Sequence, residues 1–167
     1  MAELSSAPLP APGPDDHIRG PEHGPLVIVY ADFECPFCAA LHHRLVRLDC
    51  RTVFRHFPVR SSHPRAWPAA CAAEAAGRQG RFWEMHDLLF ADPARLEDPH
   101  LWARARQLDL DLERFDSDRR DEPARERVRR DFKSGVRAGV VTTPTTFLWT
   151  ETGAQTLERG ELERRLG

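Results

Sequence analysis

The most informative part of this sequence is LVIVYADFECPFC, residues 26–38. Its first part, Leu26 to Tyr30, is a continuous run of aliphatic, β-branched and aromatic residues, which predicts a strand buried on both faces. Cys35 and Cys38 follow where this strand gives way to a helix, because apolar residues recur from Phe37 to Leu48 at steps of three and four. The sequence therefore places a closely spaced cysteine pair at a strand-to-helix junction.

That location suits redox chemistry. A cysteine attacks a disulfide only as its thiolate, and a free thiol with a pKa of about 8.5 is mostly protonated at neutral pH. At a helix N-cap, the unpaired N–H groups and the helix dipole stabilise an anion by about 1–2 kcal/mol. We expect Cys35 to occupy this cap, with Pro36 at the first helical position and the amides of Phe37 and Cys38 facing the sulfur. Cys35 would attack a disulfide, and Cys38, one turn along the helix, would resolve the mixed disulfide.

Two alternatives for the pair are half of a zinc site and two inert thiols. A structural zinc site needs four ligands, normally a second cysteine pair or two histidines at matched spacing. The adjacent His42 and His43 point in different directions from a helix, and His56 and His63 are interrupted by prolines. The sequence therefore predicts no metal site.

The composition is that of one globular domain, with 167 residues, 41% hydrophobic and 30% charged. A net charge of -2 gives no sign of a nucleic-acid or membrane partner, and no apolar run approaches the roughly 18–20 residues of a membrane span. The N-terminus lacks the basic start and apolar stretch of a secretory signal, so with Met1 as the native start we expect a cytoplasmic protein. In a reducing compartment the four cysteines serve chemistry or the core, and Cys50 and Cys71 are expected in the core.

The remaining periodicities divide the chain. Residues 1–20 are rich in proline and predict a flexible tail, and residues 21–167 form a single domain. Thr52 to Val59 is a predicted strand, completing a β-α-β unit with a parallel strand pair. Gly135 and Gly139 are predicted helix stop signals. The predicted helices are Ala69–Ala76, Phe82–Phe90, Leu101–Leu110 and Arg125–Val136, followed by a hairpin of Thr145–Thr150 and Gln155–Glu158 and a short helix from Glu161.

The motifs carry a family resemblance. The sequence FECPFC at residues 33–38, followed much later by Thr143-Pro144-Thr145 before a strand, resembles the DsbA-like branch of the thioredoxin-fold disulfide oxidoreductases. Three further stretches agree, and the resemblance extends from about His17 to Leu148; the stretches are VFRHFP at 53–58, ACAAEAAG at 70–77 and GRFWEMHDLLF at 80–90.

This resemblance implies a fold and a substrate site. The fold would be α/β and thioredoxin-like, with a mixed central sheet and an α-helical insertion, about residues 61–138, between the βαβ and ββα halves. The Thr143-Pro144 bond would be cis and lie beside the Cys35 sulfur. Thr143 would offer its backbone to a substrate chain, and the turn would keep metal ions from the pair. Pro36 and Phe37 complete the expected substrate-binding residues.

One departure from the family concerns proton transfer. In many relatives a buried acid six positions before the first cysteine helps the second thiol lose its proton, and this chain has Val29 there. Asp32 and Glu34 are the candidates for that role, the alternative being solvated loop acids or helix-start charges. The Pro36-Phe37 dipeptide lacks the histidine of the strongest oxidants in the family, so we expect a milder oxidant.

Four residues of the predicted helical region are considered as further site candidates. Trp83, Met85 and His86 lie at helical spacing and are expected in the core rather than in a cofactor or metal site. Trp67 is a candidate for lining a substrate groove beside the cysteine pair.

The sequence therefore predicts a thiol-disulfide oxidoreductase. It would exchange a disulfide between the Cys35-Cys38 pair and protein or low-molecular-weight thiols through a Cys35 mixed disulfide, with an unidentified redox partner and no cofactor beyond the pair. Two alternatives are a redox-sensing or chaperone-like binding module without turnover, and a thiol-independent transferase or isomerase on the same fold.

Overall fold

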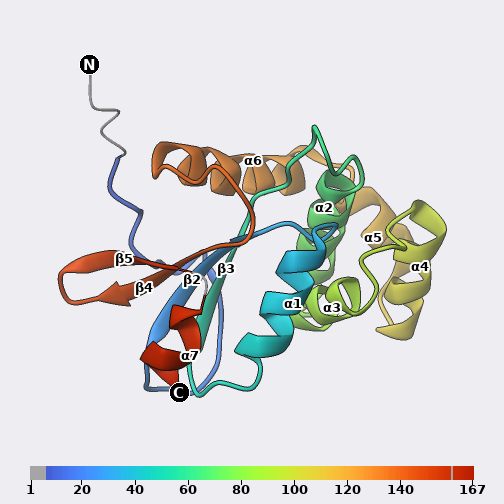
Figure 1. The fold of residues 1–167 in the computed structure, drawn as a ribbon. Helices are drawn as coiled ribbons and strands as arrows, with labels where there is room; N and C mark the ends of the chain where they lie inside the picture. The colour runs from blue at the N-terminus through green and yellow to red at the C-terminus, as the bar shows by residue number, and fades with distance from the viewer. Residues whose placement is uncertain (1–6, 159) are drawn as a thin grey trace.

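The computed structural model describes residues 7–158 and 160–167, and these build a mixed five-stranded sheet (Figure 1). Its central strands, β2 and β3, are parallel, and every other neighbouring pair is antiparallel. In spatial order the strands are β1 (His17–Arg19), β3 (Arg51–His56), β2 (Leu26–Ala31), β4 (Thr145–Thr150) and β5 (Gly153–Leu157). This is the predicted mixed α/β arrangement.

Strand β2 has a core on each side. Successive side chains of a strand point to opposite faces, and all six residues of β2 are buried. Val27, Val29 and Ala31 pack with helix α1 (Pro36–Leu45) and the helical insertion. Leu26, Ile28 and Tyr30 pack under helix α6 (Glu122–Arg137). Two covered faces explain why the sequence of this strand is continuously apolar.

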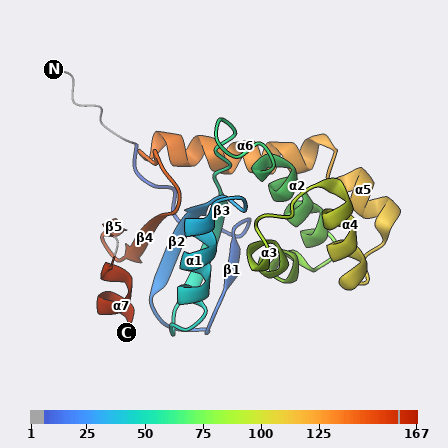
Figure 2. The same ribbon diagram turned by 45° about the vertical axis from the view of Figure 1, so that its right-hand side comes forward.

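The helices fall into three groups. Helix α1 (Pro36–Leu45) lies against the sheet, and α7 (Glu161–Leu166) follows the C-terminal hairpin. Figure 2 shows the insertion gathered beside β1, with α6 returning across one end of the sheet. The insertion consists of α2 (Ala66–Gly77), α3 (Phe82–Ala91), α4 (Asp98–Gln107), α5 (Leu112–Asp118) and α6 (Glu122–Arg137). Within the described residues, no helix combines the length and apolar character that crossing a membrane requires.

The predicted helices are all present with shifted ends, and α5 is an addition. Helix α5 has seven residues, of which only Phe115 is buried, so its apolar periodicity is too weak to read. The one signal in its sequence is Asp111, whose side chain caps the helix by accepting from the Arg114 amide.

The two glycines at the end of α6 act differently. Gly139 has φ +86° and follows the helix, and the Val140 amide donates back to the Gly135 carbonyl, so the helix ends there as predicted. The prediction that Gly135 is a stop signal is wrong, because it lies inside α6. A Cβ atom at this position would be 2.8 Å from the Phe57 ring and 2.9 Å from Tyr30. Glycine here lets α6 approach the sheet closely.

The tail predicted for residues 1–20 also needs correction. His17–Arg19 form β1, which pairs with β3, and the adjacent Asp16 makes a buried ion pair with Arg55 at 2.9 Å. A three-residue edge strand has too little pattern to be recognised in a sequence. The part of the predicted tail at residues 1–6 lies outside the described residues.

Strand β3 is shorter than predicted at its C-terminal end. It stops at His56 rather than Val59, because Pro58 has no N–H to continue the ladder.

Candidate active site

Cys35 lies at the N-cap of α1, as the sequence predicts. Its backbone is extended, with φ -81° and ψ 118°, and Pro36 begins the helix. Cys38 is on the first turn of the same helix, and both residues are free thiols. The strand, the cap and the proline therefore bring the two sulfurs together by local geometry alone.

The Cys35 sulfur is surrounded by hydrogen-bond donors. The Cys38 thiol donates to it and is the largest cause that lowers the pKa of Cys35 to about 5. Burial opposes this shift, and the amides of Cys38 and Phe37 and the side chain of Thr143 add to it. The protonated Cys35 thiol in turn donates to the Thr143 carbonyl at 3.7 Å. The Thr143-Pro144 peptide bond, directly beyond that carbonyl, is cis. Cys35 is thus a thiolate at neutral pH, facing the backbone of the Thr143 loop.

Cys38 has the opposite environment. It is 2% exposed, and burial raises the pKa of its thiol far above the ordinary value, with the neighbouring Cys35 sulfur adding to the shift. The Asp32 amide donates to its sulfur at 3.4 Å. One cysteine of the pair is ready to attack, and the other holds its proton.

Asp32 is a buried anchor of the loop that precedes the pair. Its carboxylate accepts from the Glu34 amide at 2.8 Å, the Val59 amide at 2.8 Å and His63 Nδ1 at 2.9 Å. The side chain is fully covered, so the alternative of a solvated loop acid is wrong for Asp32. Sequence reasoning considered His63 only as a metal ligand and missed this contact, which joins residues far apart in the chain.

Glu34 is held by the start of the insertion. Its carboxylate accepts from the Arg65 side chain at 2.9 Å and from the Arg65 amide at 2.7 Å. Arg65, the N-cap of α2, was not among the predicted site residues. The two acids therefore tie the cysteine loop to the insertion, and their part in proton transfer stays a prediction.

The predicted substrate residues come together on the open side of Cys35. Phe37, Thr143 and Pro144 line one groove between α1 and the C-terminal hairpin, and the Phe37 side chain is 60% exposed. Pro36 is exposed beside them. Trp67 lies in a second groove. This groove is lined by residues of the β3–α2 connection, of α6 and of the segment that leads into the Thr143 loop.

The residues predicted for the core are there. Met85 and His86 are buried, and Trp83 packs against the same core cluster. Cys50 and Cys71 are buried free thiols. Burial raises the pKa of Cys71 to about 11, which makes it a poor nucleophile.

Two groups of histidine and acid side chains meet in space although their sequence spacing is irregular. In the first, Glu74 Oε1 accepts from the Nε2 atoms of His17 and His56, each at 2.7 Å. Despite burial, these hydrogen bonds hold the pKa of Glu74 well below its usual range. The group ties β1 and β3 to α2.

The second group surrounds Asp87 on α3. Its carboxylate accepts from Arg19 at 2.8 Å and from His86 Nδ1 at 2.9 Å, and His42 Nε2 lies 3.5 Å away. The guanidinium of Arg19 already supplies the positive charge that this carboxylate needs. The group is therefore an ion-paired cluster, placed directly behind the cysteine helix.

A Cys-x-x-Cys pair at a strand-to-helix junction, facing a Thr–cis-Pro loop on a mixed sheet, defines a thioredoxin-fold thiol protein. The family model described as Thioredoxin matches residues 13–159, and the chain belongs to this family.

Curated relatives share the domain within longer proteins. The chain is 43% identical over 139 residues to the Na(+)/H(+) antiporter NhaA 1 of Salinispora arenicola, and 45% identical over 139 residues to NhaA 3 of Salinispora tropica. Each match covers 80% of this chain and 21% of the relative. The chain thus spans about one fifth of the length of these relatives.

Solved structures with the same fold have low sequence identity. A thioredoxin-like oxidoreductase from Silicibacter pomeroyi has a TM-score of 0.77 at 22% identity, covering 91% of this chain and 90% of that one. α-DsbA1 of Wolbachia pipientis has a TM-score of 0.70 at 20% identity, covering 90% of this chain and 83% of that one. DsbA2 of Pseudomonas aeruginosa has a TM-score of 0.69 at 24% identity, covering 88% of this chain and 87% of that one. These neighbours confirm the predicted DsbA-like thioredoxin fold with its helical insertion.

Proposed function

We propose that this chain is a thiol-disulfide oxidoreductase acting on protein or low-molecular-weight thiols and disulfides. The observation that carries the proposal is the contrast within the pair, a Cys35 thiol with a pKa of about 5 beside a buried Cys38 with a raised pKa. Hydrogen-bond donors on α1 and on the Thr143 loop stabilise one sulfur as an anion, an arrangement that is not expected for two inert thiols.

The proposed exchange has two steps. The Cys35 thiolate attacks one sulfur of a substrate disulfide, and the other substrate sulfur leaves as a thiolate, giving a mixed disulfide. Cys38 then loses its proton and attacks the Cys35 sulfur, which releases the second substrate thiolate and leaves a Cys35–Cys38 disulfide. The substrate gains two electrons and the pair loses two; the reverse sequence oxidises a dithiol. Both steps use the two thiols alone, as expected for an enzyme without a further cofactor.

The Thr143 loop supports the proposal on the substrate side. A backbone segment next to a reactive sulfur can pair with an extended peptide as a short strand, which aligns its disulfide for attack. Exposed Phe37 and the groove of Thr143 and Pro144 would contact the flanking substrate residues, and Trp67 would contact them on the far side of the loop.

Insulin reduction and refolding of a reduced, denatured disulfide protein test the activity. Catalysis that is lost in Cys35→Ser supports the proposal, and Cys71→Ala is the matched control because this buried cysteine lies outside the pair. Binding without turnover in the wild type would instead indicate a redox-sensing or chaperone-like module. Full activity in the double serine variant would indicate a transferase or isomerase that does not use the thiols.

The redox partner and the cellular location belong to the proposal as well. Cys38→Ser should trap partners as mixed disulfides on Cys35, and their identification would name the substrates. We expect a cytoplasmic reaction, and cell fractionation with an antibody to this chain tests that expectation. Ion exchange is an activity of the longer antiporter relatives and is not part of the proposal for this chain.

A further inference from the structure

A cavity lies behind Cys38, on the side away from the Thr143 loop. Its volume is about 230 Å³, and its lining includes Val29 of β2, Cys38 and His42 of α1, His86 of α3 and Arg19 of β1. One water needs about 15 Å³ of such space and two or more polar partners. Most of the remaining lining is apolar, and the polar side chains that would bind water in it are Arg19, Thr52, His42 and His86.

The proposed exchange requires Cys38 to lose a proton inside the protein. Among the described residues, the backbone group in contact with its sulfur is the Asp32 amide, a donor that cannot take that proton. Among the described residues that line the cavity, the side chains able to accept a proton near neutral pH are His42 and His86. His86 is buried in the core, and burial lowers its pKa to about 3, so its ring resists protonation. His42 is the acceptor that remains.

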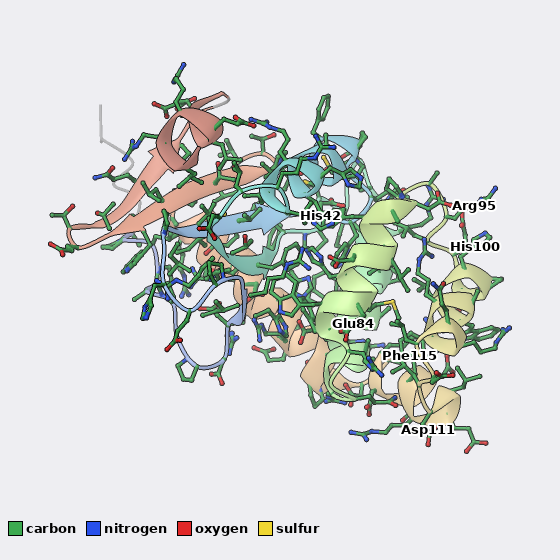
Figure 3. All side chains as sticks on the ribbon, turned by 90° about the horizontal axis from the view of Figure 1, so that it is seen from below. His42, Glu84, Arg95, His100, Asp111 and Phe115 are labelled. Carbon is green, nitrogen blue, oxygen red and sulfur yellow. The ribbon has the colours of Figure 1, made fainter. Side chains whose placement is uncertain are left out.

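His42 is well placed relative to Cys38. It follows Cys38 by four residues on α1, so the two side chains lie one above the other on the same helix face. Figure 3 shows His42 at the junction of the sheet and α3. Because Arg19 can only donate, its contact at 3.3 Å identifies His42 Nδ1 as the nitrogen without a proton.

The surroundings of His42 disfavour its protonated form, so the ring would release an accepted proton quickly. Burial, Arg19 and His43 lower the pKa of His42, and Asp87 opposes them. The neutral ring is then the resting state at physiological pH, ready to accept. Asp87, 3.5 Å from His42 Nε2, has a side chain that is 46% exposed, so the cluster leads from the cavity to solvent.

We propose that His42 accepts the Cys38 proton through cavity water and passes it by way of Asp87 to solvent. The inference rests on the proposed oxidoreductase function. As the S–H bond of Cys38 breaks, its proton moves to His42 Nδ1, the hydrogen bond from Arg19 to that nitrogen breaks, and the new thiolate attacks Cys35. The bond between Cys35 and the substrate sulfur breaks, and the substrate leaves as a thiolate.

The role of His42 can be tested separately from the oxidoreductase activity. The reduced full chain is reacted with an aromatic disulfide that releases a coloured thiolate. The first coloured thiolate reports attack by Cys35, and the second reports resolution by Cys38. His42→Gln should leave the first phase within twofold and slow the second by about tenfold or more. His43→Gln is the matched control, because this neighbouring histidine is exposed and does not line the cavity.

The pH profile distinguishes proton transfer from a structural role. The wild-type second phase should fall where His42 becomes protonated, and His42→Gln should lose that bend. Val29→Glu adds a carboxylate to the same cavity, and in the double variant with His42→Gln it should restore a fast second phase. An unchanged second phase in His42→Gln, or a slower one that keeps the wild-type bend, would overturn the inference. Absence of the first phase in the wild type would overturn the oxidoreductase function instead.

Discussion

The open and the buried sides of the cysteine pair are only three residues apart in sequence, and they differ in almost every physical respect. The Cys35 side has exposed Phe37, a carbonyl of the Thr143 loop and donors directed at the sulfur. The Cys38 side has a cavity, the anchored Asp32 and the cluster around Asp87.

The two cysteines of this one motif therefore have different chemical roles. A hydrogen bond between two equivalent thiols cannot decide which of them is the anion. The helix cap and the loop favour charge on Cys35, and desolvation opposes charge on Cys38. The pair is divided into a nucleophile and a resolving thiol by its surroundings rather than by its residue types.

Removing each sulfur in turn gives the largest effect. Cys35→Ser should abolish insulin reduction, a loss of about 1,000-fold or more, because no other described thiol has a lowered pKa. Cys38→Ser should also lose turnover but still form mixed disulfides, measured by mass spectrometry. Mixed disulfides that form equally well in Cys35→Ser would reverse the assigned roles.

Removing the anchor of the buried side should affect stability. Asp32→Ala deletes a buried carboxylate that accepts three hydrogen bonds. We expect a loss of about 2–4 kcal/mol in the free energy of unfolding, measured with urea. Asp49→Ala is the control, since Asp49 is an exposed loop acid, and its effect should stay within about 0.5 kcal/mol. Equal effects of the two changes would contradict the anchoring role.

Removing the Cys38 thiol, which donates a hydrogen bond to the Cys35 sulfur, should raise the pKa of Cys35. Cys38→Ala removes the largest cause of the lowered pKa, so the pKa should rise by about one unit, the worth of one hydrogen bond to a charge. Alkylation of Cys35 near pH 5 should then slow up to about tenfold, because the thiolate fraction falls as the pKa rises above the pH. Cys38→Ser keeps a donor and should shift less. Thiolate absorbance against pH measures both, and an unmoved midpoint in Cys38→Ala would refute the cause.

The smallest effect belongs to the exposed side. Phe37→Ala should change the free energy of unfolding by no more than about 0.5 kcal/mol, and it should raise KM for peptide disulfides by about three- to tenfold with kcat nearly unchanged. Val136→Ala removes a similarly exposed apolar side chain on α6 and should leave KM alone. Steady-state kinetics and thermal unfolding compare the two variants. A loss of stability without a change in KM would place Phe37 in the core instead.

Much of the site was readable because it is local. The strand, the cap at Cys35 and the helix of Cys38 depend on residues within one turn or strand of each other, where propensity and periodicity are strong. The Thr143-Pro144 loop was readable only through the family resemblance, since nothing in its spacing places it next to Cys35. Short elements such as α5 and β1 escaped because too few apolar positions mark them.

The order of the elements, the cysteine pair and its place at a helix start follow from the sequence alone, since they depend on neighbours along the chain. Which polar groups meet depends on the tertiary structure. It joined Asp32 to His63, Glu74 to two histidines, and His42 to a cavity shared with Cys38. Such contacts depend on how the insertion folds back onto the sheet, and their energies come from burial and charge in three dimensions, which spacing along a chain does not encode.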